Sequence, residues 1–379
     1  MRILMINYEF PPIGGGGGNV THYISKNLAQ GGHDVQVVTS RFRDLPKYEE
    51  LDGFKVHRVP VLRKSADVCG VHEMFTFVVS ASLYSLRLVK DFHPDVVHVF
   101  FGIPSGPVAY LLKKLYNLPY IVFLGGRDVP RPNPDPPFYR LVYGLLKPAI
   151  RSIWGNSRAV VACSEGLREM ALKTDSHANI HVVPDGVDLS RFHPVKRDAR
   201  PESVRILGIG RLIPRKGFDC LIRSLPEVMR LTDRDFCVEI VGDGPLRGDL
   251  TRLAEKLGVE RKVTFAGAVP YEHLDEKYQQ ADVFVLSSHA EGMPLVVLEA
   301  MASGLPIVAT QVQGIEALVR QNVNGYLFSP ADHRSLGKHL AAIIDDDAVR
   351  PRMGRESAVI VRKYDWANIT EQYLHIYES

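Results

Sequence analysis

Short apolar runs alternate with longer amphipathic segments along the whole chain, a pattern that indicates strands and helices in turn. In the first half, the runs suited to buried strands are Arg2–Tyr8, Asp34–Ser40, Asp95–Phe101, Tyr120–Leu124, Val160–Ser164 and Ile180–Pro184. Segments typical of helices, Val20–Gln30 and Pro107–Tyr116, lie between them, and Asn19 is the expected cap of the first. Strands that alternate with helices need crossover connections, so the pattern predicts a parallel sheet.

The pattern breaks at Asp188–Ser203 and then starts again. This segment is polar, holds two prolines and lacks periodicity, so it is predicted to be a linker. Beyond it, strands are expected at Val204–Gly210, Phe236–Val241, Lys262–Phe265, Asp282–Leu286, Pro306–Thr310 and Gly325–Phe328. The intervening helices are expected at Phe218–Arg230, Leu246–Leu257, Leu274–Gln280, Leu295–Ala302, Arg334–Ile344 and Ala348–Tyr364, before a tail at Trp366–Tyr377.

The two halves predict an α/β protein with two doubly wound, Rossmann-like parallel-sheet domains facing a central cleft. The first domain is expected over residues 1–190 and the second over 204–363. In such sheets, ligands bind beyond the carboxyl ends of the strands. The natural ligand site of two such domains is the cleft between them.

Composition supports this organisation and excludes several classes of protein. A chain of 379 residues suits two domains, and its 45% hydrophobic and 23% charged residues are typical of globular proteins. Lysine plus arginine is 46 against 43 acids, a balance too even for a dedicated nucleic-acid binder. The basic excess lies in the first 195 residues, which hold 22 bases and 17 acids.

The four cysteines, Cys69, Cys163, Cys220 and Cys237, lie far apart in the chain. Without a C-x-x-C pair, neither a zinc knuckle nor a redox motif is supported, and buried thiols in a reducing, cytoplasmic compartment are the preferred interpretation. The histidines show no H-E-x-x-H or similar spacing, so no metal site is expected. Neither a secretory signal nor a membrane-spanning run is visible.

Five consecutive glycines, Gly14–Gly18, separate the first predicted strand from the first helix. Glycine lets backbone N–H groups approach a phosphate closely, and the start of the helix adds a favourable partial charge. A ligand-free flexible loop is the alternative. A dinucleotide site would want an acid at the end of the second strand, where Arg41 stands instead, so only a 2′-phosphate cofactor such as NADP fits.

Three cations follow the first strand of the second half, on the loop from Gly210 to Gly217. Arg211, Arg215 and Lys216 stand at the carboxyl end of that strand. Such a loop can neutralise a diphosphate, since arginine gives paired donors and lysine a point charge. The alternative is a solvated basic turn.

Two glutamates surround a predicted helix start further along the chain. Glu291 precedes Pro294, which suits the first turn of a helix, and Glu299 lies within the apolar run LVVLEAMA. Free N–H groups near Met293–Val296 form an anion site, and a charge such as Glu299 in an apolar run needs a partner or a polar ligand. Paired carboxylates also occur in glycosidases, but those enzymes need no phosphate cradle.

Taken together, these segments resemble the retaining family-4 glycosyltransferases (glycosyl transferases group 1), which have the GT-B fold. The segment EGMPLVVLEAMASGLPIVAT is similar to the family's E-x7-E signature, with Glu291 and Glu299 as the pair, and GRLIPRKGFD is similar to its phosphate-binding loop. The glycine loop followed by LAQGGHDVQVVTS, and VVPDGVDLSRFHP before the linker, also match. The resemblance covers nearly the whole chain, in order and at family spacing.

The resemblance implies a hexosyltransferase whose second domain holds a nucleoside-diphosphate sugar and whose first domain holds the acceptor, a glycan, a lipid-linked sugar or a small molecule. It implies retention at the anomeric carbon and neither a cofactor nor a metal. A UDP-sugar is favoured over a GDP- or ADP-sugar. The tail, residues 364–379, is expected to pack back on the first domain.

Residue roles follow from the same resemblance. Arg211 and Lys216 would bind the diphosphate, and Glu299 the ribose hydroxyls. Glu291 would contact the hydroxyls of the transferred sugar, and Gly15 and Gly16 would close over the phosphates. The expected donor site also includes Gly292, Met293, Leu295 and Val296.

One departure concerns catalysis. Many family members have a histidine near the sugar in a segment that here reads FLGGRD, where Gly125 takes the histidine's place and Asp128 is kept. His98 or Asp128 would then be the catalytic side chain. Alternatively, the leaving phosphate accepts the proton from the acceptor and no side-chain base is needed. His98 is expected at the carboxyl end of the strand run DVVHVFF, facing the cleft, and it is equally well interpreted as a buried, hydrogen-bonded core histidine.

Two further interpretations concern function and location. A noncatalytic nucleotide-sugar-binding protein with the same fold is the main alternative to an enzyme. The segment 138–154, FYRLVYGLLKPAIRSIW, mixes aromatic residues, leucines and cations, which suits a helix on an anionic membrane surface. A buried helix with snorkelling cations fits the same residues. The expected location is the cytoplasm or the cytoplasmic face of a membrane.

Overall fold

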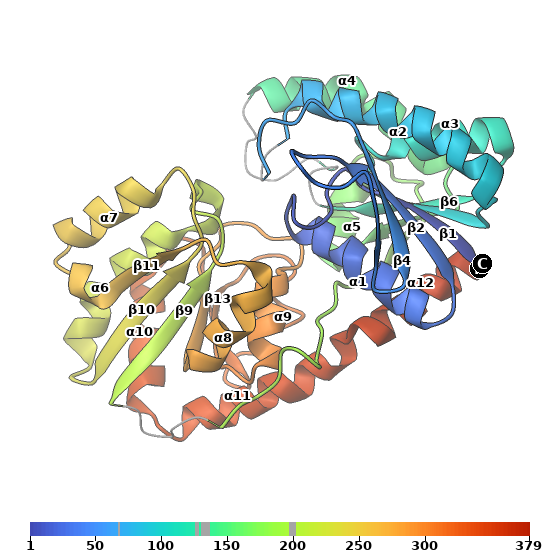
Figure 1. Ribbon diagram of the computed structural model, residues 1–379. Coiled ribbons are helices and arrows are strands. Elements are labelled where there is room, and N and C mark those ends of the chain that lie inside the picture. Colours follow the sequence, from blue (N-terminus) through green and yellow to red (C-terminus); the bar gives the residue numbers. More distant parts are fainter. Residues whose placement is uncertain (67–68, 126–128, 130–136, 197–201) are drawn as a thin grey trace. The chain divides into compact units, whose positions relative to one another are not determined.

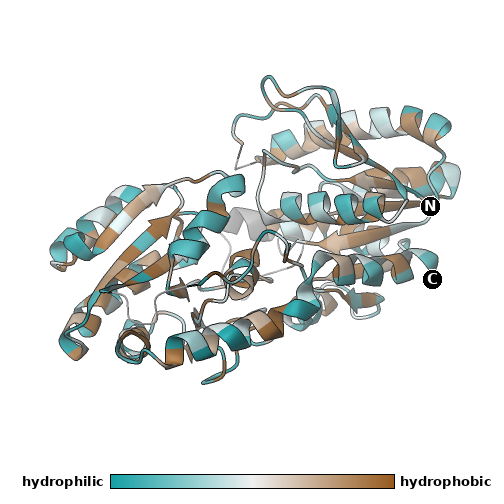
Figure 2. Cartoon of the chain, turned by 60° about the horizontal axis from the view of Figure 1, so that its bottom comes forward, coloured by the Kyte–Doolittle hydropathy of each residue, from teal (hydrophilic) through white to brown (hydrophobic). Residues whose placement is uncertain are grey.

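The computed structural model describes residues 1–379 except 67–68, 126–128, 130–136 and 197–201. The chain divides into two compact units. Unit 1 comprises Met1–Asp185 and Trp366–Ser379, and unit 2 comprises Gly186–Asp365. In both units the strands are predominantly hydrophobic, in agreement with sheets that are covered on both faces (Figure 2).

Unit 1 is built on an eight-stranded sheet in the order β3-β4-β2-β1-β5-β6-β7-β8. The strands are β1 (Arg2–Ile6), β2 (Asp34–Ser40), β3 (Tyr48–Leu51), β4 (Phe54–Val59), β5 (Val96–Phe100), β6 (Tyr120–Leu124), β7 (Ala159–Ala162) and β8 (Ile180–Val182). The β3–β4 pair is antiparallel, and the other pairs are parallel. In the central register, Ile3 pairs with Val35 of β2 on one side and with Val96 of β5 on the other.

Helices cover both faces of this sheet (Figure 1). They are α1 (Gly16–Gln30), α2 (Val71–Phe92), α3 (Gly106–Tyr116), α4 (Pro137–Gly155), α5 (Glu165–Leu172) and α12 (Trp366–Glu378). Helix α3 packs against both α2 and α4, and α12 packs against α1. The stacked rings of Tyr23 and Trp366, with centroids 5.5 Å apart, fix the start of the C-terminal helix on unit 1.

Several elements of unit 1 differ from the sequence prediction. Strands β3 and β4 and helix α2 lie within residues 42–94, for which no element was predicted. Helix α1 begins at Gly16 and not after Asn19, because the last glycines of the run adopt helical geometry and form its first turn. Asn19 is therefore inside the helix.

Unit 2 has a six-stranded parallel sheet in the order β11-β10-β9-β12-β13-β14. Its strands are β9 (Ser203–Ile209), β10 (Asp235–Val241), β11 (Val263–Gly267), β12 (Val283–Leu286), β13 (Ile307–Thr310) and β14 (Gly325–Phe328). Its α-helices are α6 (Phe218–Leu231), α7 (Arg247–Lys256), α8 (Leu274–Gln280), α9 (Leu295–Ala302), α10 (His333–Asp345) and α11 (Val349–Ile360). Leu221, Leu225, Ile240 and Leu340 lie in its fully buried core.

The predicted linker is only partly a linker. Phe192 is buried, with its ring 5.6 Å from that of Tyr278 and 6.2 Å from that of Tyr271, so this part of the segment belongs to unit 2. Val187 forms a bridge with Asp365, which brings the first and last residues of unit 2 together. The last predicted helix is also divided, because α11 ends at Ile360 and a 3₁₀ turn, Val361–Tyr364, follows it.

Candidate functional site

Most of the residues predicted to bind the donor gather at one point of the unit 2 sheet. Strand β9 lies between β10 and β12, so the chain leaves β9 toward one side of the sheet and returns beside it through β12. At such a switch point the loops beyond the two carboxyl ends diverge and leave room for a ligand. The loops here are 210–217 after β9 and 287–294 after β12.

An ion pair joins these two loops. The ammonium Nζ of Lys216 lies 2.6 Å from Oε1 of Glu291, and the side chains are 14% and 7% exposed. Backbone contacts hold the loops in place: the N–H of His289 donates to the carbonyl of Arg215 at 2.8 Å, and Ser287 Oγ donates to the carbonyl of Lys216 at 3.2 Å. The pair is therefore preorganised and largely shielded from water.

Gly217 makes this approach of the loops possible. Its φ of +61° is left-handed, and a Cβ atom at this position would lie less than 3.0 Å from the carbonyl oxygen of Ser287. A side chain here would both strain the backbone and push the loops apart. The predicted basic loop thus depends on its last glycine to bring Lys216 to Glu291.

The cations determine the charge of Glu291. Burial by itself would raise the pKa of this carboxyl, but Lys216 and Arg215, together with the hydrogen bond from Lys216, hold it below its usual value. Glu291 is therefore ionised at neutral pH. Arg211 lies on the exposed part of the same loop, at the carboxyl end of β9.

Glu299 lies inside the helix that follows this loop, α9 (Leu295–Ala302), and is almost fully buried. The hydroxyl of Tyr278, on α8, donates to its Oε2 at 2.7 Å, and the same hydroxyl lies 3.2 Å from the carbonyl oxygen of Val296. Burial raises the pKa of Glu299, opposed by hydrogen bonds from Tyr278 and Tyr271. The carboxyl is thus oriented by tyrosine hydroxyls of α8 and the turn before it.

Helix α9 begins beside these carboxyls. Pro294 is its N-cap, and Leu295 and Val296 in the first turn are partly exposed, while the first turn holds no acid. The first N–H groups of a helix have no acceptor within it, so they are available to an anion. Gly314, with φ +80°, packs on the carbonyl of Gly292 so closely that any Cβ there would clash.

The glycine loop of unit 1 stands at the switch point of the other sheet, between β1 and β5. Asn7 at the end of β1 holds the start of α1, since its Nδ2 donates to the carbonyl of Gly17 and to Thr21 Oγ1. The N–H of Gly15 donates to Glu9 Oε2 at 3.2 Å, and a Cβ at Gly15 would meet open space. Gly15 and Gly16, the N-cap and the first residue of α1, are therefore exposed and accessible to a ligand.

Phe101 fills the interior of this switch point. It follows β5 with a left-handed φ of +72°, and its ring lies 5.2 Å from that of Tyr8. A Cβ atom at Gly17 or at Gly125 would lie within 3.0 Å of the Phe101 ring. No histidine side chain can therefore stand at residue 125 while this ring keeps its place.

His98 lies in the middle of β5 and not at its carboxyl end. It is fully buried, stacks on Phe100 with centroids 4.3 Å apart, and shares a 2.8 Å hydrogen bond with the hydroxyl of Tyr377 on α12. Burial lowers the pKa of His98 to about 3, so the ring is neutral. This environment favours the interpretation of His98 as a core residue that fixes α12. Asp128, the other predicted catalytic side chain, lies outside the described residues.

Family models match both units. The model Glycosyltransferase Family 4 matches residues 14–191, and the model Glycosyl transferases group 1 matches residues 191–358. The chain belongs to the family-4 glycosyltransferases. Two parallel-sheet α/β units are the domains of their GT-B fold, as the sequence predicted.

Individual relatives agree with this assignment over nearly their whole length. The glycogen synthase of Mycobacterium tuberculosis is 28% identical over 403 residues, which cover 100% of this chain and 94% of the relative. Among solved structures, sucrose-phosphate synthase of Thermosynechococcus elongatus has a TM-score of 0.83 at 23% identity, covering 100% of this chain and 98% of the other. The Anabaena protein HepE, solved with UDP and glucose, has a TM-score of 0.75 at 18% identity, covering 99% and 98%.

Sequence reasoning missed two residues of this glycosyltransferase that shape its candidate sites. Tyr278, which orients Glu299, is distant in sequence and carries no motif. A hint of Phe101 was present in the sequence. Glycine at residue 125, where many family members carry a histidine, leaves a space that another side chain can fill, and here the ring of Phe101 fills it.

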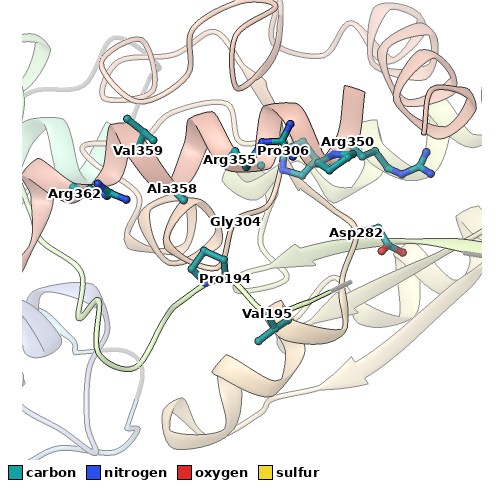
Figure 3. A pocket seen from close by; sticks show the side chains of 12 residues that line it. Pro194, Val195, Asp282, Gly304, Pro306, Arg350, Arg355, Ala358, Val359 and Arg362 are labelled. Atoms are coloured by element: carbon teal, nitrogen blue, oxygen red, sulfur yellow. The ribbon is translucent and has the colours of Figure 1, made fainter. Parts of the chain in front are cut away.

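A separate pocket of about 410 Å³ lies within unit 2, between α11 and the segment at Pro194 (Figure 3). Asp282 and Pro306, at the amino ends of β12 and β13, are part of its wall. The pocket is therefore at the opposite edge of the sheet from Lys216 and Glu291, and it contains none of the predicted donor-binding residues.

Proposed function

We propose that this glycosyltransferase moves a hexose from a nucleoside-diphosphate sugar to a hydroxyl of a glycan, a lipid-linked sugar or a small molecule, with retention at the anomeric carbon. The observation that carries the proposal is the buried Lys216–Glu291 pair beside the start of α9 at the switch point of unit 2. This arrangement presents a cation, free amides and a carboxylate within one small region. A molecule with both phosphates and hydroxyls matches all three.

The diphosphate is bound by Arg211, Lys216 and the N–H groups at the start of α9. As the bond between the anomeric carbon and the phosphate oxygen breaks, negative charge grows on the leaving phosphate. Fixed cations and helix amides stabilise that charge without reorganising, which is the usual basis of electrostatic catalysis. Because these groups supply the positive charge, the proposed reaction needs no metal ion.

The two carboxyls bind hydroxyl groups of the donor. Glu299, oriented by Tyr278, accepts hydrogen bonds from the ribose. Glu291, kept ionised by Lys216, accepts hydrogen bonds from the transferred sugar, and Gly292, Met293, Leu295 and Val296 line the same helix start. In unit 1, the N–H of Gly15, which donates to Glu9 Oε2, would turn to the phosphates together with that of Gly16 when the donor binds.

Transfer with retention requires the new bond to form on the face from which the phosphate leaves. The acceptor oxygen bonds to the anomeric carbon, and the departing phosphate oxygen takes the acceptor's proton. The space at Gly125 is occupied by the Phe101 ring, which supports a reaction without a side-chain base at that position. HepE was solved with UDP, which supports a UDP-sugar as the first donor to test.

The experiment is to mix the enzyme with UDP-, GDP- and ADP-sugars and an acceptor panel, without added metal, and to measure release of nucleoside diphosphate. The anomeric configuration of the product is then read by NMR. Lys216→Ala should lose most turnover, and Lys256→Ala, an exposed lysine on α7, should not. Donor binding without any release would instead identify a noncatalytic binding protein, and an inverted product would contradict the retaining mechanism.

A further inference from the structure

Helix α2 exposes a row of large apolar side chains. Val71, Phe75, Val79 and Leu83 recur every four residues, so they share one face of the helix, and they are 44 to 68% exposed. The opposite face is also apolar, since Phe77, Ala81, Val89 and Phe92 are buried against the rest of unit 1. A helix that is apolar on both faces is ordinarily covered on both.

The row is part of a larger surface. Leu141 and Leu145 on α4 are 64% and 73% exposed, and α3 packs against both α2 and α4 on the same side of the sheet (Figure 1). Of the sixteen large apolar side chains that are exposed in the described part of the chain, ten lie between Leu62 and Leu145. Single exposed apolar residues are common, but such a concentration marks an interaction surface.

The same helices are rich in cations. In the described part of helices α2, α3 and α4 there are six lysines and arginines: Arg87, Lys90, Lys113, Lys114, Lys147 and Arg151. These helices hold two acids, Glu73 and Asp91. Glu73 is buried and accepts hydrogen bonds from the N–H groups of Lys64 and Gly70, so it contributes little outward charge.

We propose that the exposed faces of α2 and α4 dock unit 1 onto an anionic lipid surface, with Phe75, Leu83, Leu141 and Leu145 entering the headgroup boundary. Apolar side chains flanked by lysine and arginine bind such surfaces through combined burial and charge attraction. A second copy of the chain is a poorer occupant. A symmetric contact through this surface would bring its cations against those of the other copy. No helix in the described part of the chain is both long and apolar enough to cross a bilayer.

This inference deepens the proposed function. A transferase that docks in this way would meet lipid-linked acceptors at the bilayer surface. Docking is measured without donor or acceptor, so its failure would leave the proposed transfer reaction standing, and loss of transfer would leave docking standing.

The test uses the full chain and vesicles of phosphatidylcholine, with and without about one third phosphatidylglycerol. Wild-type protein should co-sediment with the anionic vesicles and be released by high salt, since exposed charges are screened. Binding to neutral vesicles should be at least tenfold weaker. Equal binding to both vesicles, or to neither, would overturn the proposal.

Substitutions identify the surface. Phe75→Ser with Leu83→Ser should weaken binding to anionic vesicles about tenfold or more, and Arg87→Glu with Lys90→Glu about 25-fold or more, since each cation near such a surface contributes about fivefold. Met229→Ser and Lys256→Glu, exposed on α6 and α7 of unit 2, are the matched controls and should bind as wild type. Circular dichroism and Tm confirm that the exposed substitutions leave the fold intact.

Two results would show that the surface has another purpose. If the α2 variants bind vesicles as tightly as the controls, the surface does not dock on lipid. If wild-type protein is dimeric by light scattering and the Phe75→Ser, Leu83→Ser variant is monomeric, the occupant is a second copy of the chain.

Discussion

The ring of Phe101 occupies the space into which a side chain at residue 125 would project. This contact joins the end of β5 to the end of β6 at the switch point of unit 1, and it depends on the left-handed backbone of Phe101. The identity of residue 125 is thus coupled to that of residue 101. While the Phe101 ring keeps this place, packing favours glycine at residue 125, whatever chemistry the site performs.

We predict that Gly125→His destabilises the protein by about 1–3 kcal/mol through overpacking. In the background of Phe101→Ala, which itself costs about 3–5 kcal/mol by leaving a cavity, the same histidine should cost much less because it fills the vacated space. Urea denaturation of the four proteins of this double-mutant cycle measures the coupling. Gly144→His on α4, where a Cβ meets open space, is the control. Additive effects of the two substitutions would show that the ring moves aside.

How far the sequence predicts the fold depends on the pattern that each element presents. Parallel strands buried on both faces, such as β5 and β12, appear as continuous apolar runs and were predicted within a few residues. Strand β3, with sequence YEEL, is a polar edge strand and gives no such signal. Helix α2 was missed because its outer row of apolar side chains removes the helical contrast between a buried and a solvated face.

The residues of the candidate site also differ in how well the sequence predicts them. Lys216 and Glu291 were predicted because each lies in a local motif, and the parallel sheet brings the ends of neighbouring strands together. Phe101 and Tyr278 act through contacts between distant segments, and no local pattern specifies such contacts. His98 lies in an apolar strand run, where sequence alone did not separate a residue at the carboxyl end from one in the core.

Removing the cation of the buried pair should affect both activity and pH dependence. Lys216→Met leaves Glu291 buried without its partner, so turnover should fall about 10²–10³-fold, the range seen when one charge-stabilising group is removed. In the wild type, the lowered pKa of Glu291 gives stability that is present above the unfolded pKa and is lost as pH falls through the folded value. In the variant, burial is opposed only by Arg215 and by the hydrogen bond from Ser288, so the folded pKa of Glu291 should rise and this contribution to stability should shrink. Tm measured between pH 4 and 8 tests the change, and parallel curves for the two proteins would contradict it.

Glu299 should matter for binding more than for folding. Glu299→Gln keeps an oxygen that accepts the hydrogen bond from Tyr278 and removes a charge whose pKa burial has raised. Stability at neutral pH should therefore be unchanged or higher. The affinity for a nucleoside diphosphate should fall about tenfold or more, because a hydrogen bond from ribose to a charged group is replaced by a neutral one. Titration calorimetry with UDP and with free pyrophosphate separates the roles, since only the ligand with ribose should lose affinity.

Removing the hydrogen bond between His98 and Tyr377 tests whether His98 has a structural or a catalytic role. Tyr377→Phe removes the hydroxyl and leaves a buried ring nitrogen of His98 without this partner. The free energy of unfolding should therefore fall by about 1–3 kcal/mol. Because the folded pKa of His98 is about 3, below its unfolded value, stability is present above about pH 6.5 and is lost as pH falls toward the folded value. Turnover of the folded Tyr377→Phe variant at neutral pH should match that of the wild type. If its kcat falls in a pH-dependent way while its Tm is unchanged, His98 takes part in the reaction and the core interpretation is wrong.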